Sequence, residues 1–83
     1  LLTVSPNPEN GRCILLFDSD YEGSVMVESF DLYGRPIHRD ELRKHSGPLS
    51  HELDFNAQGA GMYLVRVTAG TSRTFVKWIN AGK

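Results

Sequence analysis

Apolar and polar residues alternate along most of the chain with a period of two. The clearest example is the segment 62–69, in which Tyr63, Val65 and Val67 fall on one face and the residues between them fall on the other. This period is that of a β-strand with one buried face. No segment of the sequence carries apolar residues at helical spacing over three turns. The pattern therefore predicts β-structure throughout.

Short apolar segments recur about every ten residues, separated by Gly, Pro or Asn. We expect strands over 2–5, 12–17, 24–30, 36–42, 49–55, 62–69 and 72–79. About seven short strands at this spacing predict an all-β fold, an immunoglobulin-like antiparallel β-sandwich, with Trp78 packed in its core. Between the strands, 43–48 is predicted to be a polar loop, and 40–44 is compatible with a single helical turn.

The composition is that of one small globular domain. The chain has 83 residues, 40% of them hydrophobic, and a formal net charge of −1. We expect a single domain over residues 1–83 and, because the chain starts at Leu1 without a start Met, a piece of a longer polypeptide. The charges form no basic cluster, which argues against nucleic-acid binding. No apolar run approaches the roughly 18 residues of a membrane-spanning helix, so no membrane insertion is expected.

Cysteine and histidine offer little metal or redox chemistry. Cys13 is the only cysteine, which excludes an intrachain disulfide, and it lies in an apolar run where a buried thiol is expected. His38, His45 and His51 are well separated, and no two of them have the spacing of a zinc site. We expect no metal ion and no cofactor.

One acidic segment resembles part of a calcium loop. Residues 18–23 resemble D-x-D-x-[DN]-G, which is the first half of a calcium loop. A calcium loop closes with a bidentate Glu at position twelve, and counting from Asp18 that position holds Ser29. We interpret the segment as a solvated turn between two strands.

The sequence gives no sign of catalysis. It has no G-x-S-x-G motif for a nucleophilic serine. Carboxylate pairs for glycoside hydrolysis are not excluded by the ten acidic residues, but a sandwich of this length offers little concave surface. We therefore predict that the protein is not an enzyme. Tyr21 and Tyr33, which lie in turns, are the candidates for exposed sugar-stacking rings.

Turn-forming residues near the start of the chain suggest an entry at a sheet edge. Pro6 and Pro8 fix φ near −65° and remove two amide donors, so the segment 6–8 is expected to be extended and unpaired. Asn10 and Gly11 favour a chain reversal into the next strand.

Two further turns have a simple physical interpretation. Asp31 is placed to accept backbone amides across its own turn, Gly34 to supply a left-handed residue and Arg35 to pair with Asp31. Gly61 lets the chain bend into the following strand, and Tyr63 resembles a tyrosine corner, with its ring inside and its hydroxyl on backbone.

Four motifs stand in a fixed order. They are Ser5-Pro6-Asn7-Pro8-Glu9-Asn10-Gly11, then Phe30-Asp31-Leu32-Tyr33-Gly34-Arg35, then Leu53-Asp54-Phe55 with Ala60-Gly61-Met62-Tyr63-Leu64-Val65-Arg66-Val67, and finally Lys77 in the last strand. Together they resemble the C-terminal sorting domain of the type IX (Por) secretion system of Bacteroidota. The resemblance extends from Val4 to Ile79.

The resemblance implies an address label carried behind an N-terminal cargo domain. Such a domain passes through the periplasm, is recognised by the outer-membrane translocon and is often removed by a sortase-like protease at the cell surface. It ends at the cell surface or in the medium. The sorting-motif residues implied here are Pro6, Asn7, Pro8, Gly11, Asp31, Gly34, Arg35, Gly61, Tyr63 and Lys77.

Two other functions fit the same predicted sandwich. One is an immunoglobulin-like accessory or carbohydrate-binding module of an extracellular enzyme, which would show a coplanar strip of exposed aromatic rings. The other is an adhesion or oligomerisation domain, favoured by a large apolar patch. An open edge strand also makes a weak homodimer plausible.

Overall fold

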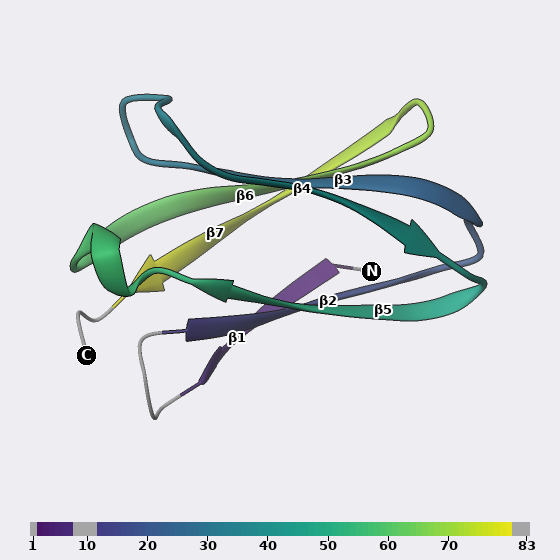
Figure 1. Cartoon of the computed structure of the whole chain (residues 1–83), viewed down its shortest axis with the longest axis horizontal. Helices are drawn as coiled ribbons and strands as arrows, with labels where there is room; N and C mark the ends of the chain where they lie inside the picture. The colour runs from purple at the N-terminus through teal and green to yellow at the C-terminus, as the bar shows by residue number, and fades with distance from the viewer. Residues whose placement is uncertain (1, 8–11, 81–83) are drawn as a thin grey trace.

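The computed structural model describes residues 2–7 and 12–80, which form seven antiparallel strands and one short 3-10 helix (Figure 1). The elements are β1 (Leu2–Asn7), β2 (Arg12–Ser19), β3 (Gly23–Phe30), β4 (Pro36–Lys44), β5 (Gly47–Asp54), the 3-10 helix η1 (Asn56–Gln58), β6 (Gly61–Ala69) and β7 (Ser72–Asn80). Each predicted strand is present, most of them longer than the sequence pattern indicated. In this part of the chain, no helix is long and apolar enough to cross a membrane.

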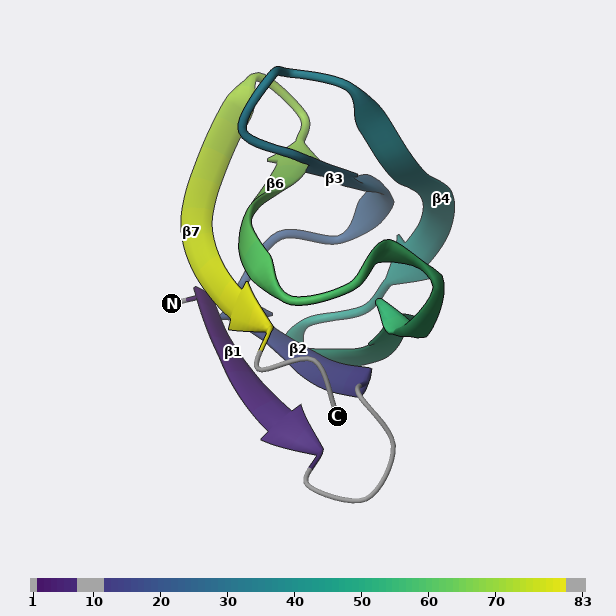
Figure 2. The ribbon, with the colours of Figure 1, turned by 90° about the vertical axis from the view of Figure 1, so that its left-hand side faces the viewer.

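The strands form two stacked sheets. One has the order β1-β2-β5 and the other the order β4-β3-β6-β7. The chain passes from one sheet to the other between β2 and β3, between β4 and β5 and again between β5 and β6. Figure 2 shows the edge strands β1 and β7 side by side, where the two also contact each other. This arrangement confirms the predicted β-sandwich.

The core lies between the sheets because inward and outward residues alternate along the central strands. Its buried apolar members are Cys13, Leu15, Phe17, Val25, Val27, Leu53, Phe55, Tyr63, Val65, Val67, Ala69 and Trp78. The predicted burial of Cys13 and Trp78 is confirmed. Desolvation in this core raises the pKa of the Cys13 thiol to about 12, so the thiol is protonated and unreactive at neutral pH.

The strand predicted over 36–42 is confirmed, but the helical turn considered for 40–44 and the polar loop predicted over 43–48 were wrong. The stretch 40–44 is the second half of β4 and pairs with β3, with Asp40 opposite Val27 and Leu42 opposite Val25. The expected polar loop shrinks to a two-residue link, because β4 continues to Lys44 and β5 begins at Gly47. Few apolar residues were needed here, because polar side chains on the inward face of β4 have partners: Asp40 lies 3.1 Å from Nε2 of His51, and Lys44 donates to backbone carbonyls.

The expectation of an unpaired segment 6–8 was also wrong in part. Pro6 and Asn7 belong to β1 and lie opposite Cys13 and Arg12 of β2. A proline is tolerated there because β1 is an edge strand, with a ladder on one side only. Pro8, Asn10 and Gly11 lie outside the described residues.

Candidate recognition site at one end of the sandwich

The turn between β3 and β4 is held by the carboxylate of Asp31. Its Oδ1 accepts the backbone N–H groups of Tyr33 and Arg35, each at 2.9 Å, and its Oδ2 lies 3.0 Å from Nε of Arg35. Gly34 has φ of +83° and donates its N–H to the carbonyl of Asp31 at 3.1 Å. The predicted local roles of Asp31, Gly34 and Arg35 are therefore confirmed.

These contacts stabilise the ionised form of Asp31. The hydrogen bond from the backbone N–H of Arg35 is the largest cause that lowers the pKa of Asp31, followed by the N–H of Tyr33 and the charge of Arg35, while desolvation opposes them. All of these partners lie within four residues of Asp31. The Asp31 carboxylate thus makes its hydrogen bonds and its ion pair within the turn. The side chains that the turn exposes to solvent are those at its tip, Leu32, which is 69% exposed, and Tyr33, which is 97% exposed.

A second turn lies next to the first, between β5 and β6. The hydroxyl of Tyr63 lies 2.8 Å from the carbonyl oxygens of Gln58 and Gly59, as predicted for a tyrosine corner. From the far end of β7, Nδ2 of Asn80 donates to the same Gly59 carbonyl at 2.8 Å. The Tyr63 ring packs on Phe55, with 4.9 Å between the ring centroids. The shape of this turn is therefore fixed by side chains of β6 and β7.

A hollow of about 520 Å³ separates the two turns. It is lined by Asp31, Leu32, Tyr33, Arg35, Gln58, Ala60, Gly61, Met62 and Tyr63. Leu32 and Met62 also line a second hollow, which lies on the outer face of the four-stranded sheet. We call the two turns and the first hollow the turn end of the domain.

The structure brings most of the sequence-predicted residues together. Asp31, Gly34, Arg35, Gly61 and Tyr63 lie at or around the turn end, and Lys77 lines the second hollow. Pro6 and Asn7 lie apart from them, on the edge of the other sheet. Pro8 and Gly11 are outside the described residues.

Sequence reasoning missed several polar groups that hold this end together. Ser29 is fully buried, and its Oγ lies 2.6 Å from Nδ1 of His38, whose Nε2 lies 2.9 Å from the carbonyl oxygen of Asp54. Since a carbonyl only accepts, Nε2 carries a proton, and in the neutral ring Nδ1 then accepts from the Ser29 hydroxyl. The strand period could have found these residues, because Ser29 follows Val25 and Val27 on the inward face of β3.

The serine and histidine pair is structural. A serine hydrolase needs its hydroxyl open to substrate, and the Ser29 side chain is sealed in the core with its hydroxyl committed to His38. Among the described residues, no group of three or more His, Cys, Asp or Glu side chains is placed to hold a metal ion. The turn end therefore consists of two ordered turns with Leu32 and Tyr33 exposed at the tip of one of them.

Two comparisons with known proteins bear on the identity of the chain. A search of curated proteins found no significant match. A comparison with known families matches residues 3–81 to the secretion system C-terminal sorting domain, a family of sorting signals and not a known enzyme family. The match covers nearly the whole chain, including both turns and the last strand. The chain therefore belongs to the type IX secretion C-terminal sorting domains, and it is a sorting signal for export to the cell surface or for secretion.

Proposed function

We propose that this domain sits behind an N-terminal cargo, travels with it through the periplasm, and is the part that the outer-membrane translocon recognises. The observation that carries the proposal is the turn end. There Leu32 and Tyr33 are 69% and 97% exposed on a turn whose backbone is fixed by Asp31. A rigid turn loses little conformational entropy on binding, which favours its use as a recognition element.

The proposed contact has two parts. The partner packs on Leu32 and Tyr33 and enters the hollow between the two turns. β7 is an edge strand with no hydrogen-bonded neighbour on one side, although β1 lies close to it there. This unpaired edge offers a second mode in which a partner strand adds to the sheet. We further propose that a sortase-like protease then removes the domain by cutting on the N-terminal side of β1.

A carbohydrate-binding function has weaker support. The two turn tyrosines lie at opposite ends of β3. Tyr21 is half-buried against the core and its hydroxyl donates to the carbonyl of Ser24 at 2.9 Å, so its ring is not free to stack on a sugar. Tyr21 and Tyr33 therefore do not form the coplanar strip of exposed rings that is typical of a carbohydrate-binding module.

The proposal is tested by an export assay. Residues 1–83 are fused behind a flexible linker to a periplasmically targeted fluorescent protein, in a Bacteroidota strain with an active type IX system. We expect the reporter at the cell surface or in the medium, and its loss from both in a translocon-deficient strain. A folded fusion that stays in the periplasm of the competent strain would contradict the proposal.

The turn end is tested in the same assay with paired variants. Leu32→Ser with Tyr33→Ser removes the exposed apolar tip, and we expect at least a tenfold loss of export. Ile14→Ser with Leu16→Ser removes apolar side chains that are 40% and 39% exposed on the other sheet, and serves as the matched control. Equal export of the two double variants would exclude the turn tip as a contact. Retention of the domain on exported cargo in a strain without the sortase-like protease would support the cleavage step.

A further inference from the structure

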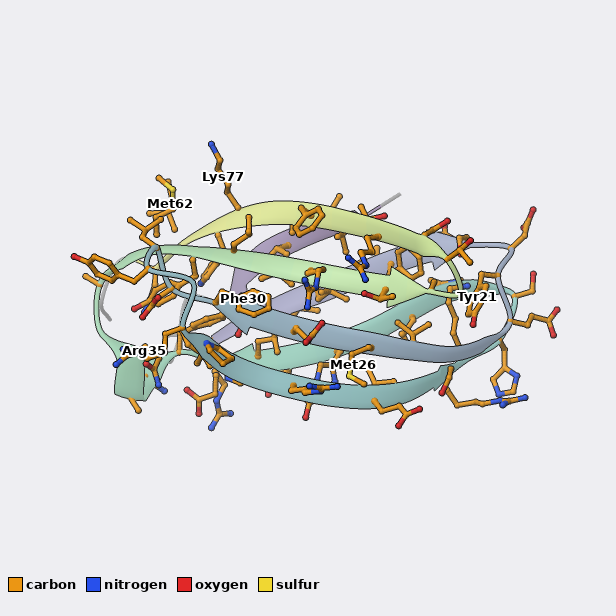
Figure 3. All side chains as sticks on the ribbon, turned by 90° about the horizontal axis from the view of Figure 1, so that it is seen from above. Tyr21, Met26, Phe30, Arg35, Met62 and Lys77 are labelled. Carbon is orange, nitrogen blue, oxygen red and sulfur yellow. The ribbon has the colours of Figure 1, made fainter. Side chains whose placement is uncertain are left out.

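The outer face of the four-stranded sheet carries a second hollow, of about 410 Å³. It is lined by Phe30, Asp31, Leu32, Gly34, Met62, Tyr63, Leu64, Arg66, Phe75 and Lys77. Three of these lie in one row across the sheet, because Phe30 pairs with Leu64 and Leu64 pairs with Lys77. Figure 3 shows Phe30, Met62 and Lys77 on the same half of this face, at the end away from Tyr21. We call this hollow the sheet groove.

The sheet groove is apolar and open. Phe75 on one side is 52% exposed, Leu32 is 69% exposed and Met62 is 37% exposed, while Phe30 and Leu64 are half-buried beneath them. Side chains of this size clustered on a small domain leave apolar surface in water, and such patches mark contact sites. The volume suits one or two side chains of a partner.

The two cations beside the sheet groove differ in what they contact. Arg66 is already paired within the domain. Its guanidinium lies 2.6 Å from Oε1 of Glu28, and it also lies over the Phe30 ring, 4.9 Å from the ring centroid. Lys77 is exposed, and among the described residues no carboxylate lies within ion-pair distance of it. Lys77 is therefore a cation available to a partner at the border of an apolar surface.

The rest of this face is also basic. By strand register its outward charged residues are Arg39, Arg43, Arg66, Arg73 and Lys77, against Glu28 and Glu41. The face thus carries three more positive than negative side chains, although the whole chain has a net charge of −1. A potential of this sign favours a partner surface that is acidic.

We propose that the sheet groove binds an extended, acidic segment of a protein of the export machinery. An apolar side chain of that segment fills the space between Leu32, Met62 and Phe75, and a neighbouring Asp or Glu pairs with Lys77. This inference rests on the proposed function, because it assigns the segment to the translocon. It adds a second contact surface, which shares Leu32 with the turn tip and extends from there over the outer face of the sheet, and it names the chemistry of that surface.

Charge reversal at two positions of β7 distinguishes a specific contact at the sheet groove from a general effect of the positive charge of this face on export. Lys77→Glu places a carboxylate at the sheet groove, whereas Arg73→Glu makes the same change on the same strand and face, outside the sheet groove. In the export assay we expect at least a tenfold loss for Lys77→Glu and less than a twofold loss for Arg73→Glu. Lys77→Gln, which removes the charge without reversing it, should fall between them. Equal export of Lys77→Glu and Arg73→Glu would overturn the proposal.

A photo-crosslinking side chain at position 75 identifies the molecule that binds in the sheet groove. In cells that export the fusion, we expect an adduct with a translocon protein from position 75 and none from position 16 on the opposite sheet. The unmodified fusion is the reference: if it is not exported, the proposed function fails, whereas normal export without an adduct at position 75 overturns only the sheet groove. An adduct with a second copy of the chain, or with anionic polysaccharide, would overturn the assigned occupant. Thermal unfolding of each purified variant is the control for whether the fold is retained.

Discussion

At the scale of single residues, the turn end is built from contacts that are close in sequence. Asp31 finds all of its partners between Tyr33 and Arg35, and Tyr63 reaches back only to Gln58 and Gly59. Such short-range roles follow from side-chain chemistry and turn geometry, so the sequence was sufficient to predict them. The result is a pair of stiff turns whose polar groups are satisfied internally.

Replacing Asp31 by Asn should reveal how much the negative charge of Asp31 stabilises the fold. The pKa of Asp31 is lowered in the folded state, so its ionised form stabilises the fold above the unfolded pKa of about 3.9, and this contribution is lost as the pH falls through the folded pKa. The stability difference between wild type and Asp31→Asn should therefore be larger at pH 7 than at pH 3, measured by urea unfolding. Asp20→Asn, in an exposed turn at the other end of β3, is the comparison. An equal pH dependence of both variants would contradict the assignment.

Removing the Tyr63 hydroxyl should loosen the second turn. Tyr63→Phe keeps the ring on Phe55 but loses the hydrogen bonds to Gln58 and Gly59, and we expect a loss of about 1 kcal/mol in the free energy of unfolding. Tyr33→Phe, at a fully open position, should change stability by less than about 0.5 kcal/mol. Chemical denaturation of the three proteins decides the point, and a neutral Tyr63→Phe would refute it.

At the scale of elements, the missed feature is the buried end of β4. Lys44 is 1% exposed, and its Nζ donates to the backbone carbonyls of Ser19, Tyr21 and His45. The ammonium group also lies 5.7 Å from the centroid of the Phe17 ring. This side chain joins the β2–β3 crossing to the β4–β5 crossing. The sequence analysis missed Lys44 because a lysine among polar residues at the end of a strand is typical of a loop.

Lys44→Met should be destabilising by about 2 kcal/mol. The substitution keeps an apolar stem over Phe17 but leaves three carbonyl groups without their donor, which outweighs the relief of a buried charge. Arg43→Met, the exposed neighbour on the opposite face, should change stability by less than about 0.5 kcal/mol. Thermal and urea unfolding of both variants provide the measurement. A neutral Lys44→Met would mean that burying the charge costs as much as its three hydrogen bonds contribute.

At the scale of the whole molecule, the sequence predicted the strands and the sandwich from the two-residue period and the spacing of Gly, Pro and Asn. It failed where long-range partners decide the outcome. The edge strands β1 and β4 extend further than their own residues indicate because β2 and β3 provide a ladder. Ser29 and Asn80 are buried polar residues whose partners come from other elements, His38 in β4 and Gly59 in the turn between β5 and β6. The sheet groove likewise depends on residues from β3, β6 and β7 that meet only after folding.

The topology also predicts slow folding for a chain of this length. The central pairs β2–β5 and β3–β6 join segments that are distant in sequence, and such contacts require loop closure before they stabilise anything. We expect refolding on the order of milliseconds to seconds. Trp78 is the single tryptophan and is buried, so its fluorescence in stopped-flow refolding reports on the core. Refolding within microseconds would show that local contacts dominate instead.

Because of the hydrogen bond from Asn80 to Gly59, the second turn at the turn end is complete only after the last residue of β7 has been synthesised and has docked. Ribosomes make β7 last, so until its final residue docks, the Gly59 carbonyl lacks one of the donors that hold the second turn in place. Amide hydrogen exchange at 59–61 should accordingly be faster in Asn80→Ala than in wild type, and unchanged in Arg73→Ala. A chain cut short before Asn80 would lack this donor, so its second turn would be held less firmly, and under the proposed function we expect weaker export of its cargo.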